Sequence, residues 1–476
     1  MSDAIRVRFA PSPTGYLHVG GLRTALYNYL YARKVGGRFI LRIEDTDQER
    51  YVEGAVENLI NTLDIVGLKP DEGPATGGDF APYYQSQRTE LYRNYAAELV
   101  EKGAAYYCFC SSEELDAMRE EQQQEGYVTG YDGRCRNIAP AEAKKRAADG
   151  EPYVIRLKTP DEGEVFFYDI VREKVTFNWD MVDDQVLIKS DGFPTYHLAN
   201  VVDDHLMEIS HVIRGEEWLS SVPKHLFLYE QFGWKPPKMA HLPLLLNPDK
   251  SKLSKRQGDV AVEDYLAKGF LPSAMINFVV LLGWHAAGDR EIFSLAELEK
   301  EFSLKRVNKA GAVFDIEKLR WMNGQYLKNE PLAEIIKFAR PFFLERFGDI
   351  EEDRLSRLID YARPRAATLI EMTEECLPFM QKLEYSAEDR ALLEEETSKA
   401  MFSFWLEELS LQKPLTAESV NALLKATSEK FDLKGKMLYS PLRLALFGTE
   451  HGPDLLQIIE LSGLQTSLKR LQIWTD

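Results

Sequence analysis

The chain has 476 residues, which is too long for one hydrophobic core and predicts two to four domains. Its composition, with 45% hydrophobic and 28% charged residues, is typical of a globular protein, and no apolar run approaches membrane-spanning length. Because residues 1–4 also lack the basic and apolar regions of a targeting segment, we expect a cytoplasmic protein with no membrane partner.

The net charge is strongly negative, because 58 basic and 76 acidic residues give −18. This balance at first argues against a nucleic-acid partner, but such binding depends on local basic patches and phosphate contacts. Three patches are present, and each could equally be a solvated face: Lys144–Arg146, Lys250–Arg256, and Lys305–Arg306 with Lys309.

The first predicted unit is a strand, a turn and a helix. Residues 5–9 alternate between apolar and charged or small side chains, as in a strand, and the apolar residues of 22–30 recur with the spacing of an amphipathic helix. A phosphate could rest at the N-terminus of this helix. Prolines stiffen the connection, and glycines would let a nucleotide approach the backbone: Pro11, Pro13, Gly15, Gly20 and Gly21.

His18 stands at the mouth of this predicted helix. Its ring could donate to a phosphate oxygen whose charge grows during phosphoryl transfer. A helix-capping histidine without chemistry explains the residue equally well, so the rest of the chain has to decide between the two interpretations.

A second strand is predicted over residues 38–43, and the acidic run Glu44–Asp47 follows its C-terminal end. Open α/β sheets bind their ligands at this end of their strands, where a carboxylate can hold an amino group. A cluster of helix N-caps is the alternative. Helices over 54–66 and 87–101 continue the wound pattern.

Three of the four cysteines lie close together in the sequence, at Cys108, Cys110 and Cys135. Such spacing suggests a zinc site, which normally has four sulfur or nitrogen ligands. Asn137 is a poor ligand, and Tyr131 is a conceivable substitute. Reduced cysteines without a metal are favoured, so we expect no bound metal.

Residues 140–188 interrupt the wound pattern with strands predicted at 154–158, 165–168 and 185–188. The pattern then returns at 191–200. Tyr196 and Asn200 would face one ligand if a helix begins there, and Arg214, at the end of a strand over 211–214, could clamp a carboxylate with two parallel hydrogen bonds.

The segment Lys250–Gly258 has four cations in seven residues and follows an apolar run. It would make a positive lid for a polyphosphate, whereas a solvated basic loop is the alternative. Two phosphate-oriented elements in one chain favour the lid.

From about residue 331 onward nearly all of the sequence has helical periodicity, with helices expected over 335–347, 354–372, 392–408, 417–430 and 453–473.

These motifs together resemble those of a known family. Arg8–Gly21 is similar to the first signature of class I aminoacyl-tRNA synthetases, with His18-Val19-Gly20-Gly21 in place of His-Ile-Gly-His. Lys252–Arg256 is similar to their Lys-Met-Ser-Lys-Ser loop. Pro11–Gly15, with Arg42–Asp47 downstream, is most similar to bacterial glutamyl-tRNA synthetases, whereas glutaminyl relatives carry a Pro-Glu-Pro-Asn-Gly turn.

The resemblance implies an α/β fold, namely a Rossmann-like doubly wound parallel sheet with an inserted α/β acceptor-binding domain, a stem-contact region and a C-terminal all-α anticodon-binding domain. In some family members a histidine at the place of Asn137 completes a zinc site. The implied segments are 1–105 and 191–240 for the two halves of the catalytic domain, 106–190 for the insertion, 241–330 for the stem contact and 331–476 for the helical domain.

The implied activity is ATP-dependent ligation of L-glutamate to tRNA(Glu), through a glutamyl-adenylate. ATP would bring soluble Mg²⁺, with no tightly bound cofactor, and we expect a monomer. The alternatives are a non-discriminating form that also glutamylates tRNA(Gln), and a catalytically silent tRNA-binding protein. A truncated relative that modifies tRNA bases lacks the helical tail, so residues 331–476 argue against it.

The resemblance also implies roles for individual residues. Arginines would provide the charge that distinguishes glutamate from the near-isosteric glutamine. For the anticodon-contacting residues, salt bridges at the edge of the core are the alternative. The implied residues are His18 and Lys255 for catalysis; Pro11, Gly15, His18, Gly20, Gly21, Lys252, Ser254, Lys255 and Arg256 for ATP; Arg8, Ala10, Ser12, Glu44, Tyr196, Asn200 and Arg214 for glutamate; and Arg365 and Arg443 for the anticodon.

Overall fold

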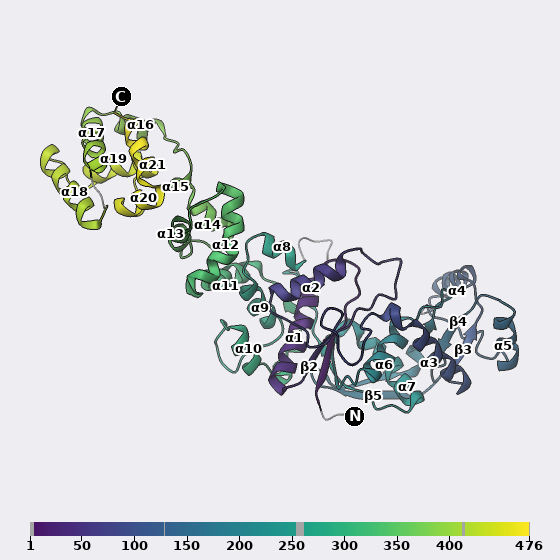
Figure 1. Ribbon diagram of the computed structural model, residues 1–476. Helices are drawn as coiled ribbons and strands as arrows, with labels where there is room; N and C mark the ends of the chain where they lie inside the picture. Colours follow the sequence, from purple (N-terminus) through teal and green to yellow (C-terminus); the bar gives the residue numbers. More distant parts are fainter. Residues whose placement is uncertain (1–3, 128, 254–260, 412–414, 476) are drawn as a thin grey trace. The chain divides into compact units, whose positions relative to one another are not determined.

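The computed structural model describes residues 4–127, 129–253, 261–411 and 415–475. The chain divides into two compact units, whose helices and some of whose strands are labelled in Figure 1. Unit 1 comprises residues 1–267 and 272–319, and unit 2 comprises residues 268–271 and 320–476.

The main sheet of unit 1 is mostly parallel, as the sequence predicts. β1 (Arg6–Phe9) pairs with β2 (Arg38–Leu41), and β8 (His211–Gly215) pairs with β9 (Lys238–Leu242), both in parallel. The Arg6 N–H donates to Ser210 Oγ and the Ser210 N–H donates to the Arg6 carbonyl, each at 2.9 Å, which places β1 next to β8. The carboxyl ends of these strands therefore meet at one edge, where such sheets bind ligands.

Helix α1 (Val19–Val35) connects β1 to β2, and its apolar residues Leu22, Leu26 and Leu30 are fully buried. It ends at Gly36, whose φ of 67° lies in the left-handed region that favours glycine. At Gly37 a Cβ would lie 2.5 Å from the Ile5 carbonyl oxygen, so only glycine lets the chain turn this closely into β2.

The strands of the interrupting segment are shared between two sheets, which differs from the sequence expectation. β3 (Ala105–Cys108), β4 (Val154–Leu157) and β7 (Val186–Ile188) form an antiparallel sheet. β5 (Glu164–Asp169), however, joins the main sheet in parallel with β9, and β6 (Glu173–Asn178), which was not predicted, pairs with β5. Alternation of apolar and polar residues predicts a strand with one exposed face, but it does not predict which other strand will pair with it.

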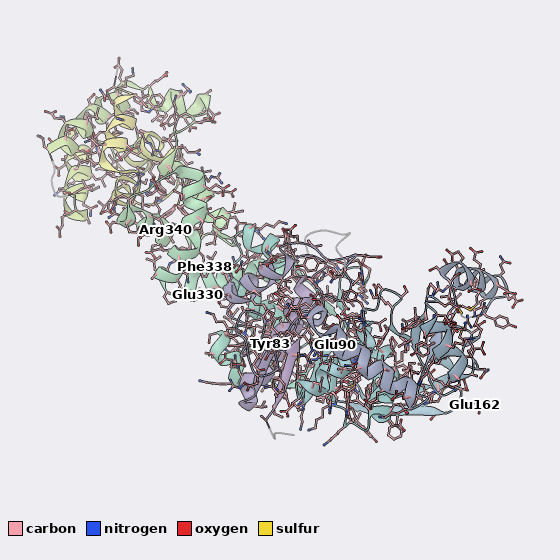
Figure 2. The ribbon with its side chains drawn as sticks, turned by 45° about the vertical axis from the view of Figure 1, so that its right-hand side comes forward. Tyr83, Glu90, Glu162, Glu330, Phe338 and Arg340 are labelled. Atoms are coloured by element: carbon pink, nitrogen blue, oxygen red, sulfur yellow. The ribbon has the colours of Figure 1, made fainter. Side chains whose placement is uncertain are left out.

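The connection between α2 (Ala55–Ile65) and α3 (Thr89–Glu101) is tied to β1 by side chains. Tyr83, labelled in Figure 2, donates from its hydroxyl to Glu72 Oε2 at 2.7 Å. Glu72 in turn accepts two hydrogen bonds from the Arg6 guanidinium, at 2.7 and 2.9 Å. These bonds hold a stretch rich in glycine and proline against the sheet.

The remaining elements of unit 1 include two helices, α8 and α9, that are separated by residues 268–271, where Gly269 has a φ of 83°. The remaining elements are α4 (Ser112–Gln124), α5 (Pro140–Ala148), α6 (Tyr196–Leu206), α7 (Val222–Phe232), β10 (Leu245–Leu246), α8 (Val262–Ala267), α9 (Pro272–Leu281), α10 (Leu295–Glu301), β11 (Ala312–Val313) and α11 (Ile316–Asn329), of which the last continues into unit 2.

The described part of unit 2 contains helices and no strand, as predicted. Cys376, Phe379, Phe402 and Trp405 are buried in its core. The helix over 436–447 was not predicted, because Pro441 lies inside it. The helices are α12 (Leu332–Phe347), α13 (Glu352–Ala362), α14 (Leu369–Glu375), α15 (Leu377–Met380), α16 (Ala387–Leu393), α17 (Glu396–Leu411), α18 (Ala417–Phe431), α19 (Lys436–Phe447), α20 (Leu455–Ser462) and α21 (Leu464–Gln472).

Candidate active site

A cavity of about 820 Å³ lies at the carboxyl ends of β1 and β8 and beside the N-termini of α1 and α6. Its lining comes from segments far apart in the sequence, so the fold brings the predicted ligand residues together. Twelve of the predicted ATP- and glutamate-binding residues line it: Arg8, Ala10, Pro11, Ser12, Gly15, His18, Gly20, Gly21, Glu44, Tyr196, Asn200 and Arg214.

His18 caps helix α1. Its Nδ1 accepts a hydrogen bond from the Gly20 N–H at 2.9 Å. A Cβ at position 20 would lie 3.2 Å from this nitrogen, so glycine lets the ring approach the helix end closely. Because Nδ1 accepts, the proton of the neutral ring lies on Nε2. Capping and donation to a phosphate are therefore compatible roles for His18.

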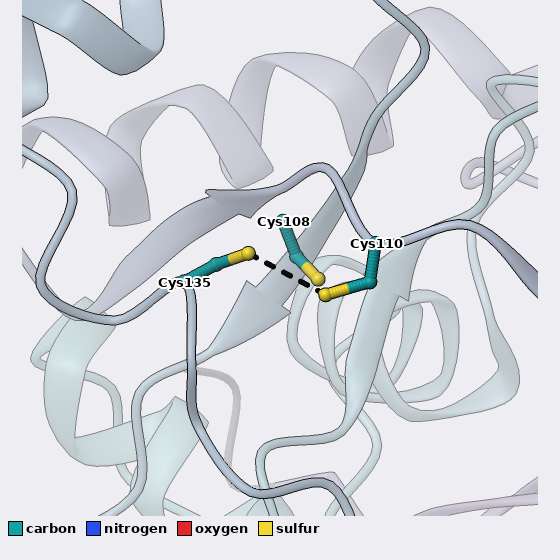
Figure 3. Close-up of side chains that lie close together, drawn as sticks. All are labelled: Cys108, Cys110 and Cys135. Atoms are coloured by element: carbon teal, nitrogen blue, oxygen red, sulfur yellow. Dashed lines mark hydrogen bonds between the residues drawn. The ribbon is translucent and has the colours of Figure 1, made fainter. Parts of the chain in front are cut away.

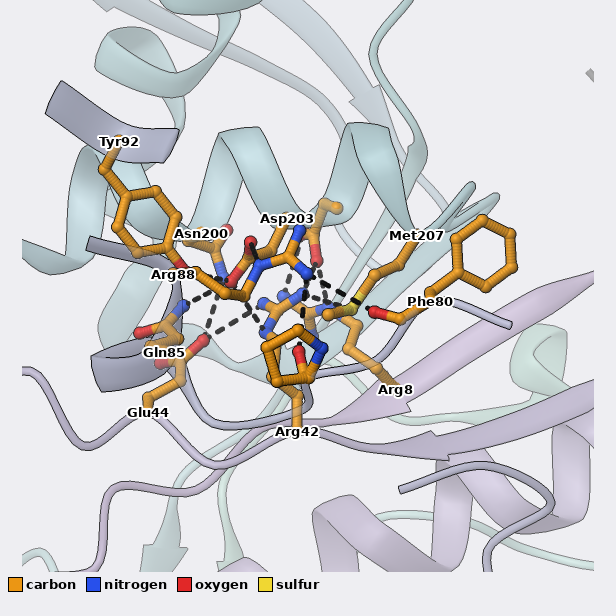
Figure 4. Close-up of polar contacts among 12 residues, drawn as sticks. Arg8, Arg42, Glu44, Phe80, Gln85, Arg88, Tyr92, Asn200, Asp203 and Met207 are labelled. Carbon is orange, nitrogen blue, oxygen red and sulfur yellow. Dashed lines mark hydrogen bonds and ion pairs between the residues drawn. The ribbon is translucent and has the colours of Figure 1, made fainter. Parts of the chain in front are cut away.

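A network of buried charges lies beside the cavity (Figure 4). The Arg42 guanidinium is fully buried, at 3.1 Å from Glu44 Oε1 and 2.7 Å from Asp204 Oδ1. Burial raises the pKa of Glu44, and Arg42 and Arg8 offset this only in part. Burial also acts to raise the pKa of Asp204, but Arg8 and Arg42 outweigh it and hold that pKa below its ordinary value.

Asn200 lies one turn before Asp204 on α6, and its amide can take two orientations. In one, Nδ2 donates to Glu44 at 3.4 Å. In the other, Oδ1 accepts from Arg8 and Arg42 at 3.2 Å each, and Nδ2 donates to Asp204 at 3.3 Å. We favour the second orientation, because it gives both ends of the amide a suitable partner.

Arg214 is held on three sides. Its Nη1 donates to the Tyr196 hydroxyl at 2.6 Å, its Nη2 to the Trp218 carbonyl at 3.3 Å and its Nε to His241 Nε2 at 3.1 Å. The rings of Tyr196 and Trp218 pack together with centroids 4.2 Å apart. The sequence prediction that a helix begins at Tyr196 is confirmed.

The cavity thus offers the guanidinium groups of Arg8 and Arg214 for a carboxylate, and the carboxylate of Glu44 for an amino group. The N-terminus of α1 can bind a phosphate. Sequence reasoning missed the residues that hold these groups, namely Arg42, Asp203, Asp204 and His241. Asp204 could have been found, because it follows Asn200 by four positions on the predicted helix. His241 gave no such signal.

The predicted basic segment is only partly described. Ser254, Lys255 and Arg256 lie outside the described residues. Lys252 is exposed, and its backbone forms an isolated antiparallel β-bridge with Leu246. It is not among the residues that line the cavity. Its contact with ATP stays a prediction.

The predicted anticodon residues lie in unit 2. Arg365 is exposed, with its guanidinium 4.0 Å from the centre of the Tyr361 ring, and it donates to the Tyr361 carbonyl. Arg443 is half-buried, and its Nε donates to the Pro453 carbonyl at 3.4 Å. The partners of these two arginines are tyrosine rings and carbonyl oxygens rather than carboxylates.

Cys108, Cys110 and Cys135 converge (Figure 3). The ligand atoms of Cys108, Cys110 and Cys135 all lie within 4.8 Å of one another. The Tyr131 hydroxyl is 3.3 Å from Cys108 Sγ and 3.8 Å from Cys110 Sγ. Three sulfurs and one oxygen make a donor set that fits Zn²⁺, with Tyr131 rather than Asn137 as the fourth group.

Across the described residues, the helices are too short or too polar to pass through a membrane.

A Rossmann-type sheet whose first βα turn carries a proline- and glycine-rich stretch and a capping histidine, followed by a helical unit, defines a class I aminoacyl-tRNA synthetase. The family described as "tRNA synthetases class I (E and Q), catalytic domain" matches residues 4–321, and the "Anticodon binding domain" matches residues 334–475. The chain therefore belongs to the glutamate–tRNA ligase family of class I synthetases.

Its relatives match over nearly their full length. The glutamate–tRNA ligase of Chlorobium luteolum is 49% identical over 488 residues, which covers 98% of this chain and 97% of that protein. That of Clostridioides difficile is 46% identical, with 98% of each chain covered. A crystal structure of a glutamate tRNA ligase from Elizabethkingia meningosepticum, in complex with its amino acid, has a TM-score of 0.89 and 38% identity and covers 99% of both chains.

Proposed function

We propose that the protein ligates L-glutamate to tRNA(Glu) in two steps. The α-carboxylate of glutamate attacks the α-phosphorus of ATP, which forms glutamyl-adenylate and releases pyrophosphate. A hydroxyl of the 3′ terminal ribose of the tRNA then takes the glutamyl group, and AMP leaves. No protein nucleophile is needed, because the chain has only to align the reactants and neutralise charge. The main support is the convergence of twelve predicted ligand residues on one cavity.

In this proposal Arg8 and Arg214 bind the γ-carboxylate of glutamate, and Glu44 binds its α-amino group. Ala10, Ser12, Tyr196 and Asn200 complete the contacts with the amino acid. Glutamine would be rejected because its amide lacks the negative charge and would bring N–H groups against N–H groups.

ATP, which the family uses, would bind at the start of α1, with soluble Mg²⁺ on its phosphates. The His18 Nε2–H would donate to the reacting phosphate, and Lys255 would neutralise the departing pyrophosphate. The tRNA would contact the insertion over 106–190 with its acceptor end, 241–330 with its stem and 331–476 with its anticodon, near Arg365 and Arg443. We propose a monomer that acts in the cytoplasm.

Side-by-side charging of purified tRNA(Glu) and tRNA(Gln) with labelled glutamate, ATP and magnesium tests the proposal. Product on tRNA(Glu) alone supports the discriminating enzyme, and product on both supports the non-discriminating form. If well-folded protein charges neither tRNA, the silent tRNA-binding protein takes the place of this proposal. ATP–pyrophosphate exchange in the presence of glutamate and tRNA checks the first step separately.

A further inference from the structure

Three neighbouring strands of the main sheet place Asp169 and His241 in line behind Arg214, which lines the cavity. His241 and Arg214 are register partners on β9 and β8, and Asp169 ends β5 on the other side of β9. His241 Nε2 accepts from Arg214 Nε at 3.1 Å, and His241 Nδ1 lies 2.7 Å from Asp169 Oδ2. All three side chains are buried.

Hydrogen-bond chemistry fixes the state of this histidine. An arginine Nε–H can only donate, so His241 Nε2 has to accept and the ring proton has to lie on Nδ1. That proton points at Asp169. Burial lowers the pKa of His241, so its ring is neutral at neutral pH, as this arrangement requires.

Asp169 is itself held firmly by the backbone. Its Oδ1 accepts from the N–H groups of Val171 and Arg172, at 2.9 Å each, and its Oδ2 accepts from the His241 N–H at 3.1 Å. Burial acts to raise the pKa of Asp169, but the hydrogen bond from His241 and these N–H groups outweigh it, so the carboxylate is ionised. An ionised carboxylate offers only acceptors to Nδ1.

We propose that Asp169 and His241 are positioning residues for glutamate specificity. Asp169 fixes the tautomer of His241, and His241 fixes the guanidinium of Arg214 so that its two remaining N–H groups point at the substrate carboxylate. Neither residue is among those that line the cavity. This inference rests on the proposed function, because it assigns the γ-carboxylate to Arg214.

The variant Asp169→Asn tests the inference because it should reverse the tautomer of His241. The backbone N–H groups of Val171 and Arg172 would hold the amide oxygen of the new side chain, which turns its NH₂ group toward His241 Nδ1. Nδ1 then has to accept, so the ring proton moves to Nε2 and faces the Arg214 N–H. We expect the KM for glutamate in tRNA-dependent ATP–pyrophosphate exchange to rise about tenfold or more, with the KM for ATP unchanged.

A second variant distinguishes positioning from a merely structural role. The amide of His241→Gln can rotate to present its oxygen to Arg214 whatever residue stands at 169. The double variant Asp169→Asn with His241→Gln should therefore bind glutamate better than Asp169→Asn alone. The matched control is His211→Gln, which changes a buried histidine at the start of β8, the strand that carries Arg214, and should leave the KM for glutamate unchanged.

The outcomes separate this inference from the proposed function. If Arg214→Gln leaves the KM for glutamate unchanged, the proposed glutamate site fails. Only the positioning role fails if Arg214→Gln raises the KM for glutamate but folded Asp169→Asn keeps the wild-type KM. The same conclusion follows if the double variant does not lower the KM for glutamate below that of Asp169→Asn. Should Asp169→Asn not fold, ¹⁵N-histidine NMR of the wild-type protein decides, with His241 assigned by its loss in His241→Gln. A proton on its Nε2 would overturn the inference.

Discussion

Arg8 and Asp204 form a two-point ion pair beside the cavity. Arg8 Nε lies 3.0 Å from Oδ1 and Arg8 Nη2 lies 3.2 Å from Oδ2, with side chains that are 4% and 1% exposed. The same carboxylate accepts from Arg42 at 2.7 Å. Asp204 therefore balances two buried cations and sets the position of an arginine that lines the cavity.

The variant Asp204→Asn should destabilise the protein. Removing the carboxylate leaves Arg8 and Arg42 short of a buried counter-charge, which costs about 3 kcal/mol. Because the pKa of Asp204 is lowered, its stabilising contribution is present above the ordinary aspartate pKa and is lost as the pH falls through the lowered value. We therefore expect a lower melting temperature at neutral pH, measured by circular dichroism.

Asp64→Asn is the matched control for this measurement. Asp64 pairs with Lys69 at 2.9 Å, but both side chains are more than half exposed. Water screens such a pair, so the melting temperature should hardly change. Equal losses in the two variants would contradict the role assigned to Asp204.

Glu44 predicts a pH dependence of glutamate binding. Its pKa lies above the ordinary 4.5, because burial outweighs the neighbouring arginines. As the pH falls through this raised pKa, Glu44 becomes neutral and no longer attracts the α-ammonium group of the substrate. The KM for glutamate should therefore rise on acidification from neutral pH, before the ordinary glutamate pKa is reached.

Glu44→Gln is the variant that checks this assignment. It should have a raised KM for glutamate at neutral pH and a weaker dependence on acidification. A wild-type KM in Glu44→Gln at every pH would exclude Glu44 as the amine ligand.

The sequence predicted the local framework of the site well, because its signals are short-range. Pro11, Pro13 and Gly15 mark a turn by their own backbone preferences, and the apolar spacing after it marks a helix. From the sequence, His18 could be either a helix cap or a phosphate donor. The structure shows the capping hydrogen bond, from the Gly20 N–H to His18 Nδ1.

The sequence could not predict which distant groups meet. Asp169 and His241 are 72 residues apart, and the join of β5 to β9 that brings them together was not foreseen. A buried Asp is also unusual, so its residue type favours a surface position. The pairing of β5 with β9 brings Asp169 and His241 together, and their hydrogen bond offsets the free-energy cost of burying both side chains.

The cluster of Cys108, Cys110 and Cys135 leads to a prediction about metal content. We expected no metal from the sequence, because Asn137 is a poor ligand. The convergence of three thiols around Tyr131 argues against that expectation, because it supplies four donors. We therefore expect protein purified without chelator to contain about one zinc per chain by elemental analysis.

Two variants test which groups hold the zinc. Tyr131→Phe removes the oxygen donor and should lose zinc to a chromogenic chelator faster than the wild-type protein. Cys376→Ser, which changes the buried cysteine of unit 2, should retain the wild-type content. Metal-free protein with four reactive thiols after denaturation would restore the original expectation.

The last prediction concerns Lys255, which lies outside the described residues and is assigned by its motif alone. Lys255→Ala should lower the rate of adenylate formation about 100-fold or more, because one fewer cation neutralises the departing pyrophosphate, while the melting temperature stays the same. Lys250→Ala removes an equal charge from an exposed position nearby, outside the predicted ATP contacts, and should have a much smaller effect. Single-turnover measurements with saturating ATP distinguish a slower chemical step from weaker binding. Equal rate losses in the two variants would mean that the segment acts through its total charge, and a fall in melting temperature that accounts for the whole loss would remove Lys255 from the mechanism.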